Sequence, residues 1–361
     1  MKRRKLLLGL SLALLLQGCS PALLEREYMT ERVHVENSYL TDSSVLRADS
    51  YDALVEDLLQ LVSQGTEHGI IRLFNYAGDV REDLARACLE VKRDRPLGAY
   101  AVDYMTHEVS RIVSYDEVHV YITYRRSPEQ IKSIVAATGR NAVRQVLQDT
   151  LSRFAPSAVL LVSDLEAEAS DIQSFLQEVY DTLPGAAFGL PECRVSLYPS
   201  EGANERIVEI ELAYREKQES LLQKQTQVEQ AASGLVSRGR AVFGKELLAR
   251  LHQELCRQTV YKADGGDTVY DALIRGEANS EGIAMAMALL CQRAGLPCSV
   301  VRGTRNESPW VWNRVTLGEE VVELDVSADS MAHTEELRYV PVGEMGSAYT
   351  YAPAALPNAA S

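Results

Sequence analysis

The sequence predicts an α+β protein made of two small α/β modules and a larger third domain. Within residues 49–216, apolar strand-like runs alternate with amphipathic helical patterns, and this order occurs twice. Within residues 268–329, one apolar helical run is followed by three strand-like runs. A chain of 361 residues with 46% hydrophobic content is long enough, and apolar enough, for two to three globular domains.

Residues 1–18 have the pattern of a lipoprotein signal peptide. Basic residues from Lys2 to Lys5 precede an apolar run, Leu6 to Leu16, that is too short to cross a bilayer. The run ends in Leu-Gln-Gly-Cys19, which resembles the bacterial lipobox. The resemblance implies that Cys19 carries fatty-acyl chains such as palmitate, and that the protein is anchored to the extracytoplasmic face of the cell membrane. A cleaved signal with an unmodified Cys19 is the alternative.

Composition excludes several classes of function. Removing residues 1–18 takes away four basic residues and no acidic one, so the formal net charge changes from −14 to −18. Nucleic-acid binding needs a basic face, so we expect no nucleic-acid partner. The cysteines after Cys19 are odd in number and form no C-x-x-C pair, which favours neither a zinc site nor a disulfide scaffold. We therefore expect no metal and no cofactor. These cysteines are Cys88, Cys193, Cys256, Cys291 and Cys298.

Residues 19–48 are polar and are expected to form a tether. Module 1 is expected over 49–126 and module 2 over 127–216. Both end in similar sequences, YITYR at 121–125 and ELAYR at 211–215, so we interpret them as a duplicated α-β-α-β-β unit, with chance similarity as the alternative. The expected helices are 50–62, 80–91, 128–154 and 172–183, with a split of the third at Gly139 as the alternative. The expected strands are 69–75, 118–124, 158–163, 194–198 and 206–214.

The third domain is expected over 217–345, followed by an Ala- and Pro-rich disordered tail, 346–361. After a Gln-rich helix, a polar turn from Gly276 to Ser280 leads into an apolar helix that Gly295 and Pro297 terminate. Strands are expected at 298–302, 310–317 and 320–326.

The order and spacing of ten residues in this domain resemble the transglutaminase-like superfamily, which has a papain-type fold. In that family a nucleophilic Cys begins the helix, a His lies two residues before a Trp-Asn pair, and an Asp ends a later strand. Here Ser280 occupies the Cys position and Trp310 the His position, and only Asp325 is retained. The matching residues are Gly276, Gly282, Ala284, Leu289, Gly295, Gly303, Trp312, Asn313, Val315 and Asp325.

The missing residues predict a pseudoenzyme with no catalytic site. A Ser hydroxyl needs a general base within reach, and the indole N–H of Trp310 is only a donor. We therefore expect Ser280 to be a helix N-cap and Trp310 to donate a hydrogen bond to Asp325. Cys291 and His333 are poorly placed to replace the missing pair.

The resemblance implies a cleft that binds a peptide, a glycan or an envelope protein. Its expected lining is Ser280, Trp310, Trp312, Asn313 and Asp325. One alternative is an active cysteine protease or transglutaminase-type acyl transferase with relocated catalytic residues. The other is a structural spacer without a ligand.

Overall fold

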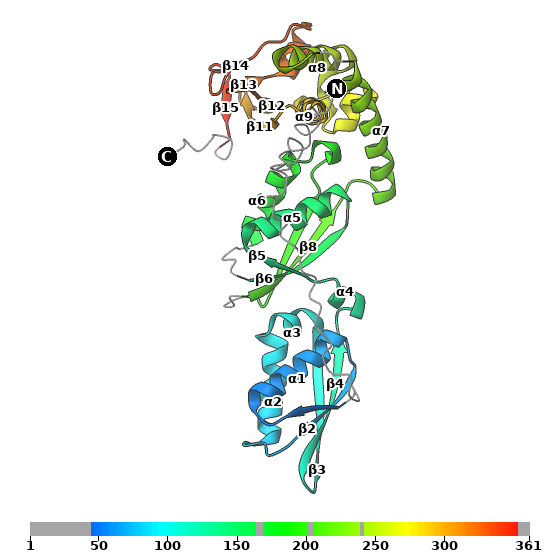
Figure 1. The fold of residues 1–361 in the computed structure, drawn as a ribbon, viewed down its shortest axis with the longest axis vertical. Helices are drawn as coiled ribbons and strands as arrows, with labels where there is room; N and C mark the ends of the chain where they lie inside the picture. Colours follow the sequence, from blue (N-terminus) through cyan, green and yellow to red (C-terminus); the bar gives the residue numbers. More distant parts are fainter. Residues whose placement is uncertain (1–44, 164–168, 201–204, 239–241, 353–361) are drawn as a thin grey trace, which may run out of the picture.

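The structure is a computed structural model, which describes residues 45–163, 169–200, 205–238 and 242–352. The two modules and the C-terminal domain follow one another along the long axis of an elongated molecule (Figure 1). The expected signal segment, Cys19 and the tether up to residue 44 lie outside the described residues. No helix in the described ranges is long and apolar enough to span a bilayer.

Module 1 packs its helices against one face of a four-stranded sheet. The strand order is β1-β2-β4-β3, with β1 parallel to β2 and the other neighbours antiparallel. Side-chain oxygens of Ser50 and Asp79 cap the first turns of α1 and α2, and Gly65 ends α1 with a left-handed φ of 68°. The elements are β1 (Val45–Ala48), α1 (Tyr51–Gln64), β2 (His68–Leu73), α2 (Val80–Arg93), α3 (Pro96–Ala101), β3 (Val102–Ile112) and β4 (Tyr115–Tyr124).

Module 2 repeats this topology. Its sheet has the order β5-β6-β8-β7, and the pairing directions match those of module 1 strand for strand. The shared topology supports the interpretation of a duplicated unit. The short helix α4 (Pro128–Lys132) leads into β5 (Val135–Thr138), α5 (Gly139–Ser152), β6 (Ser157–Ser163), α6 (Ala169–Asp181), the 3₁₀ turn η2 (Pro184–Ala186), β7 (Glu192–Tyr198) and β8 (Glu205–Ala213).

Two expectations were wrong at the first strand of each module. The expected helix 128–154 does divide at Gly139, where α5 begins, but residues 135–138 are not helical, because they pair with β6 as a parallel strand. The expected tether does not extend to residue 48, because residues 45–48 pair with β2. Both strands have only four residues. Such short strands show no periodicity of their own, and pairing with a neighbour decides their conformation.

The modules stack end to end. The face of the module 2 sheet that α5 leaves open packs against α3 of module 1, so that Tyr198 and Ile207 join the core of module 1 with Tyr100. Between them, the Arg126 guanidinium lies 2.5 Å from Glu209 Oε2 and stacks over the Tyr100 ring. Module 2 in turn places η2, the turn at the position of α3, against α9 of the C-terminal domain.

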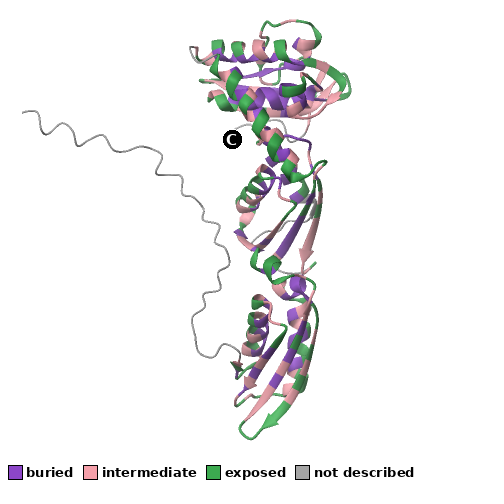
Figure 2. Ribbon diagram, turned by 90° about the vertical axis from the view of Figure 1, so that its right-hand side faces the viewer, coloured by how far each residue is buried: buried purple, intermediate pink, exposed green. Residues whose placement is uncertain are grey.

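The C-terminal domain places a buried helix, α9, against a five-stranded sheet of order β14-β13-β12-β11-β15. Figure 2 shows buried residues concentrated in the middle of this domain. The elements are α7 (Gln218–Ser237), α8 (Gly244–Gln258), β9 (Val260–Gly266), the single wide turn η3 (Asp271–Arg275), β10 (Glu277–Ala278), α9 (Ser280–Ala294), β11 (Cys298–Arg305), β12 (Ser308–Leu317), β13 (Glu320–Leu324), α10 (Val326–Met331), β14 (Val340–Pro341) and β15 (Tyr349–Tyr351).

The expected disordered tail contains a strand. β15 pairs antiparallel with β11, through Gly303 and Tyr351, Thr304 and Thr350, and Arg305 and Tyr349. The expectation of disorder over 346–361 was therefore wrong for residues 349–351, and 353–361 lie outside the described residues. Three residues in an Ala- and Pro-rich segment give no strand signal, and the free edge of β11 supplies the pairing groups.

Candidate functional site

The first turn of α9 positions Ser280 at the sheet. The helix cap is Asn279, whose Oδ1 accepts hydrogen bonds from the backbone N–H groups of Glu281 and Gly282 at 3.0 and 3.2 Å. Ser280 is therefore not the N-cap, which corrects the sequence-based expectation. Its Oγ instead accepts a hydrogen bond from the Val311 backbone N–H at 3.3 Å and joins α9 to β12.

Trp310 and Asp325 form the expected hydrogen bond. The Trp310 indole Nε1–H donates to Asp325 Oδ2 at 2.7 Å. The same oxygen accepts the Tyr349 hydroxyl at 2.7 Å, and Asp325 Oδ1 accepts the Ala328 N–H at 3.0 Å. Burial raises the pKa of Asp325 above its ordinary value, while these three donors oppose the shift. Three donors and no acceptor around the carboxyl group are complementary to its ionised form.

A cavity of about 520 Å³ opens beside Ser280 and Trp310. Three residues expected in the cleft are not on its wall: Trp312 is 1% exposed, Asn313 0% and Asp325 5%. Asn313 is used inside the fold, where its Nδ2 donates to the Ala284 carbonyl at 2.9 Å. The lining residues are Asn279, Ser280, Glu281, Arg302, Gly303, Thr304, Pro309, Trp310, Val311, Thr350, Tyr351 and Ala352.

Arg302 provides the positive charge in this wall, and no local sequence pattern predicts its role. Its guanidinium donates through Nε and Nη2 to Asp181 of module 2, at 2.7–3.0 Å. Nη2 also donates to Glu281 Oε1 at 2.8 Å. The cavity wall is therefore tied to module 2, a long-range relation that no local pattern contains.

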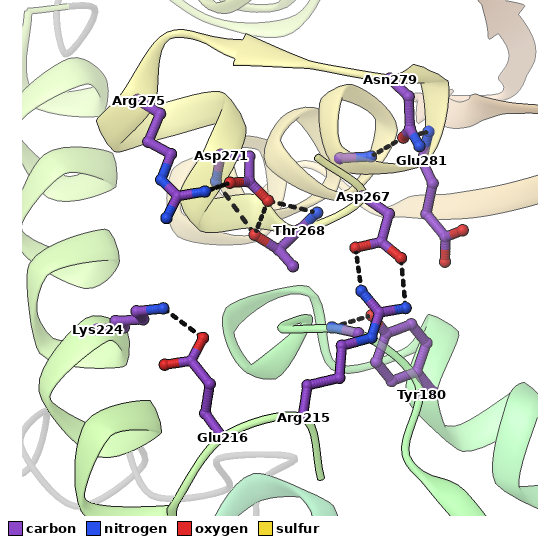
Figure 3. A network of polar contacts seen from close by, with 12 residues as sticks. Tyr180, Arg215, Glu216, Lys224, Asp267, Thr268, Asp271, Arg275, Asn279 and Glu281 are labelled. Atoms are coloured by element: carbon purple, nitrogen blue, oxygen red, sulfur yellow. Dashed lines mark hydrogen bonds and ion pairs between the residues drawn. The ribbon is translucent and has the colours of Figure 1, made fainter. Parts of the chain in front are cut away.

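A second arginine makes the reciprocal contact across the same boundary. Arg215, the second residue after β8 of module 2, donates two hydrogen bonds to Asp267 of the C-terminal domain, at 2.6 and 2.7 Å (Figure 3). In the same view Asp271 accepts from Thr268 and Arg275, which fixes the turn that precedes α9. Together, these contacts hold the start of α9 against module 2.

A Cys–His–Asp cluster lies elsewhere in the domain and was missed at the sequence level. His252 on α8 is fully buried, and its Nε2 is 3.0 Å from Asp329 Oδ2. Cys256 Sγ lies 3.7 and 3.9 Å from the two ring nitrogens of His252. The available sequence signal was the helical spacing of Leu248, Leu251, His252 and Leu255, which places a histidine on the buried face.

The cluster is poorly suited to nucleophilic catalysis. Burial, with smaller contributions from the charges of Asp329 and Glu335, raises the pKa of Cys256 to about 12. A thiol is reactive as its thiolate, which an elevated pKa disfavours. Cys256 and His252 do not line the cavity beside Ser280, and no histidine does among the residues described. His333 is exposed on the surface, as expected.

Metal binding has no support within the described ranges, where no group of three His, Cys, Asp or Glu side chains is arranged to hold an ion. The cysteines described there are all free thiols. The contacts made by polar groups at the cavity are hydrogen bonds and ion pairs between protein groups.

Comparison with known proteins finds similarity in structure alone. No protein-family model and no curated protein sequence matches the chain. A transglutaminase structure is 15% identical with a TM-score of 0.26, and the match covers 47% of this chain and 51% of that one. A candidate cysteine protease from Cytophaga hutchinsonii is 10% identical with a TM-score of 0.24, covering 42% and 66%. A candidate protease from Parabacteroides distasonis is 9% identical with a TM-score of 0.21, covering 76% and 40%.

The C-terminal domain is a mixed α+β fold in which α9 packs against the five-stranded sheet. Its helix α9, the sheet strands β11 to β13 and the positions of Ser280, Trp310 and Asp325 follow the order that the sequence resemblance implied. The chain spans about half of the transglutaminase it matches. The activities named in these comparisons belong to the matched proteins.

Proposed function

We propose that this protein is a lipid-anchored component of the cell envelope whose transglutaminase-like domain binds an extended peptide without catalysing a reaction. The observation that carries the proposal is the bonding of the two replaced positions. Ser280 Oγ accepts from a backbone N–H, and the Trp310 indole donates to Asp325. Among the described residues no histidine lines the cavity beside Ser280, so no imidazole is placed there to activate its hydroxyl.

The cavity beside these residues supports a binding role. Its wall combines two aromatic residues, Trp310 and Tyr351, parts of the strands β11, β12 and β15, and one Arg–Glu ion pair, around a volume of about 520 Å³. A wall built mainly of strand residues with a few placed polar groups suits an extended peptide better than a compact anion, because Arg302 is already neutralised by two carboxylates. A glycan strand is the ligand that the experiment must distinguish from a peptide.

The binding experiment uses the full mature chain with a set of extended peptides and, separately, envelope glycan fragments, measured by calorimetry. Thr304→Trp fills the cavity and should abolish binding, whereas Thr316→Trp, on the neighbouring strand outside the cavity, should leave it unchanged. Binding that survives Thr304→Trp would place the ligand elsewhere. Binding of glycans but not peptides would replace the proposed ligand class.

The anchor is tested separately. With Cys19→Ala the protein should leave the membrane fraction or remain unprocessed, because acyl chains on this residue are proposed to hold it there. Unchanged processing together with unchanged membrane retention would contradict the lipoprotein proposal.

A second candidate function is acyl transfer or peptide hydrolysis by relocated residues. The observation in its favour is the contact of Cys256 with His252, which Asp329 holds from the other side. The high pKa of the thiol and the full burial of the imidazole weigh against it. Rapid alkylation of Cys256 that depends on His252 would favour this candidate, whereas slow alkylation would favour the binding role.

A further inference from the structure

β15, the last strand of the described chain, occupies a binding site formed by the edge of β11, the Trp312 ring and the carboxylates of Glu323 and Asp325. This site is called the seat of β15. β15 extends the sheet by pairing with β11. Flanking backbone bonds hold both ends: the Asn306 N–H donates to the Ala348 carbonyl at 2.8 Å, and the Ala352 N–H donates to the Arg302 carbonyl at 3.0 Å. Thr350, Tyr351 and Ala352 thereby form one wall of the cavity beside Ser280.

Two tyrosines of β15 point to the two buried carboxylates of the sheet. The Tyr349 hydroxyl donates to Asp325 Oδ2 at 2.7 Å, and the Tyr351 hydroxyl donates to Glu323 Oε2. Both rings meet Trp312 edge-on, with centroid distances of 5.5 and 5.2 Å. The seat therefore recognises side chains at alternate positions of a strand, which all lie on one face.

Gly303 adapts the seat to a strand. A Cβ atom at this position would lie 2.0 Å from the Thr350 carbonyl oxygen and 2.8 Å from the Trp312 ring. A side chain at position 303 of β11 would therefore prevent β15 from pairing. Because glycine has no side chain, the two backbones can approach to pairing distance.

The connection to the rest of the fold allows β15 to leave. Residues 342–348 link it to β14 through Gly343 and Gly346, with left-handed φ angles of 84° and 91°. β14 and β15 have only two and three residues, whereas β11, β12 and α9 form the body of the domain. Release of β15 would uncover the β11 edge, Trp312 and both carboxylates without unpairing β12 from β11 or β13.

We propose that β15 is an internal occupant of a peptide-binding seat, and that the external ligand is an extended peptide with tyrosines two residues apart. This inference rests on the proposed peptide-binding function and adds the recognition pattern and its control. The ligand pairs with β11 by strand addition and replaces both tyrosine–carboxylate bonds. Because β15 is tethered, it competes at a high effective concentration, so the resting protein is closed.

The probe is a synthetic peptide with the sequence of residues 346–352, added to the full chain. Binding is followed by the fluorescence of Trp310 and Trp312, the chain's two tryptophans, and release of β15 by amide hydrogen exchange at 349–351. The double variant Tyr349→Phe, Tyr351→Phe should exchange faster at these amides. It should also bind the peptide at least about tenfold more tightly than the unaltered chain does.

Two variants separate release from binding. Gly303→Ala should also speed exchange at 349–351 but should not bind the peptide, because the added Cβ blocks the same seat. Tyr339→Phe removes a hydroxyl from the same C-terminal segment outside the seat and should behave like the unaltered chain. If thermal unfolding shows that the double variant is not folded, the single variants Tyr349→Phe and Tyr351→Phe take its place.

Three results would overturn the inference: unchanged exchange at 349–351 in the tyrosine variants, faster exchange without peptide binding, or peptide binding that Gly303→Ala leaves intact. Failure of the proposed function would give a different result. Envelope peptides would then show no binding that is sensitive to Thr304→Trp, while the 346–352 peptide would still compete with β15.

Discussion

A buried hydrogen bond between Trp310 and Asp325 joins β12 to the residue that follows β13. The indole Nε1–H lies 2.7 Å from Asp325 Oδ2, and both side chains are buried. The indole N–H is only a donor, so Trp310 cannot accept a proton from Ser280. Its contact with Asp325 holds β12 to the end of β13 and to the start of α10. The Asp325 carboxylate accepts from three donors: the Trp310 indole, the Tyr349 hydroxyl and the Ala328 backbone N–H.

Trp310→Phe should lower the free energy of unfolding of the C-terminal domain by more than the lost apolar area explains. The variant leaves a buried carboxylate short of one donor, which costs roughly 1.5–3 kcal/mol. Asp325→Asn should cost less than Asp325→Ala, because one amide oxygen still accepts from Trp310 and Tyr349. Calorimetric unfolding measures each change, and equal losses for Asn and Ala would contradict the assigned bonds.

Arg302→Ala should destabilise the protein through the two carboxylates it leaves behind. Asp181 and Glu281 both bind this guanidinium, and without it they face each other at the module boundary. We expect a loss of about 1–3 kcal/mol. The control is Arg144→Ala, which breaks an exposed ion pair with Glu178 on module 2 and should cost under about 1 kcal/mol. Similar losses in thermal unfolding for both variants would contradict the assigned role.

Asp57→Asn should stabilise module 1 at neutral and higher pH. Burial raises the pKa of Asp57 to about 7, and its Oδ2 has no hydrogen-bond partner. The folded state therefore holds the proton more tightly, so the contribution of Asp57 to stability is full below about pH 4 and is lost as the pH rises through about 7. After discounting for partial exposure, the gain above pH 7 is on the order of 1 kcal/mol.

The measurement for Asp57 is the unfolding free energy of both proteins between pH 4 and pH 8. Asp52→Asn, on the exposed first turn of the same helix, is the control and should bring no such gain. A difference between Asp57→Asn and the unaltered chain that is constant across this range would refute the prediction.

Cys256 should resist alkylation in the folded protein. With a thiol pKa of about 12, only roughly one molecule in ten thousand carries the thiolate at pH 8. Mass spectrometry after treatment with iodoacetamide should show labelling of Cys256 that is slow compared with the unfolded chain. Rapid labelling that His252→Ala or Asp329→Asn abolishes would instead favour the relocated enzyme.

The open face of the module 1 sheet should keep the protein from stacking with further copies. In module 2, the paired residues Leu161 and Ile207 lie on the face that module 1 covers. The pair at the same register in module 1 is Arg72 and Glu117, which form a 2.9 Å ion pair. A polar outer face is the usual end of a stacked array.

The double variant Arg72→Leu, Glu117→Ile copies the module 2 pair and should promote self-association, because it exposes a face that matches a covered one. Light scattering during gel filtration measures the mass. The control exchanges two charges for apolar residues at an exposed helical pair, Arg144→Leu, Glu178→Ile. Unchanged mass in the sheet variant, or equal association of the control, would contradict the capping role of this face.

The sequence by itself determined the features that depend on local pattern. The two modules, the apolar helix between Asn279 and Gly295 and the hairpin from β12 to β13 all follow from periodicity and turn residues. The Trp310–Asp325 bond was also predictable, because a buried indole seeks an acceptor and the hairpin supplies one.

Only the tertiary structure decided the features that depend on pairing between distant segments. The strands β1, β5 and β15 are too short to carry a pattern, and each exists because a neighbouring strand offers free backbone groups. The contacts of Arg302 with Asp181, and of Tyr349 with Asp325, join residues 121 and 24 positions apart. Local propensity acts over a few residues, whereas these contacts follow from how complete domains and sheet edges pack.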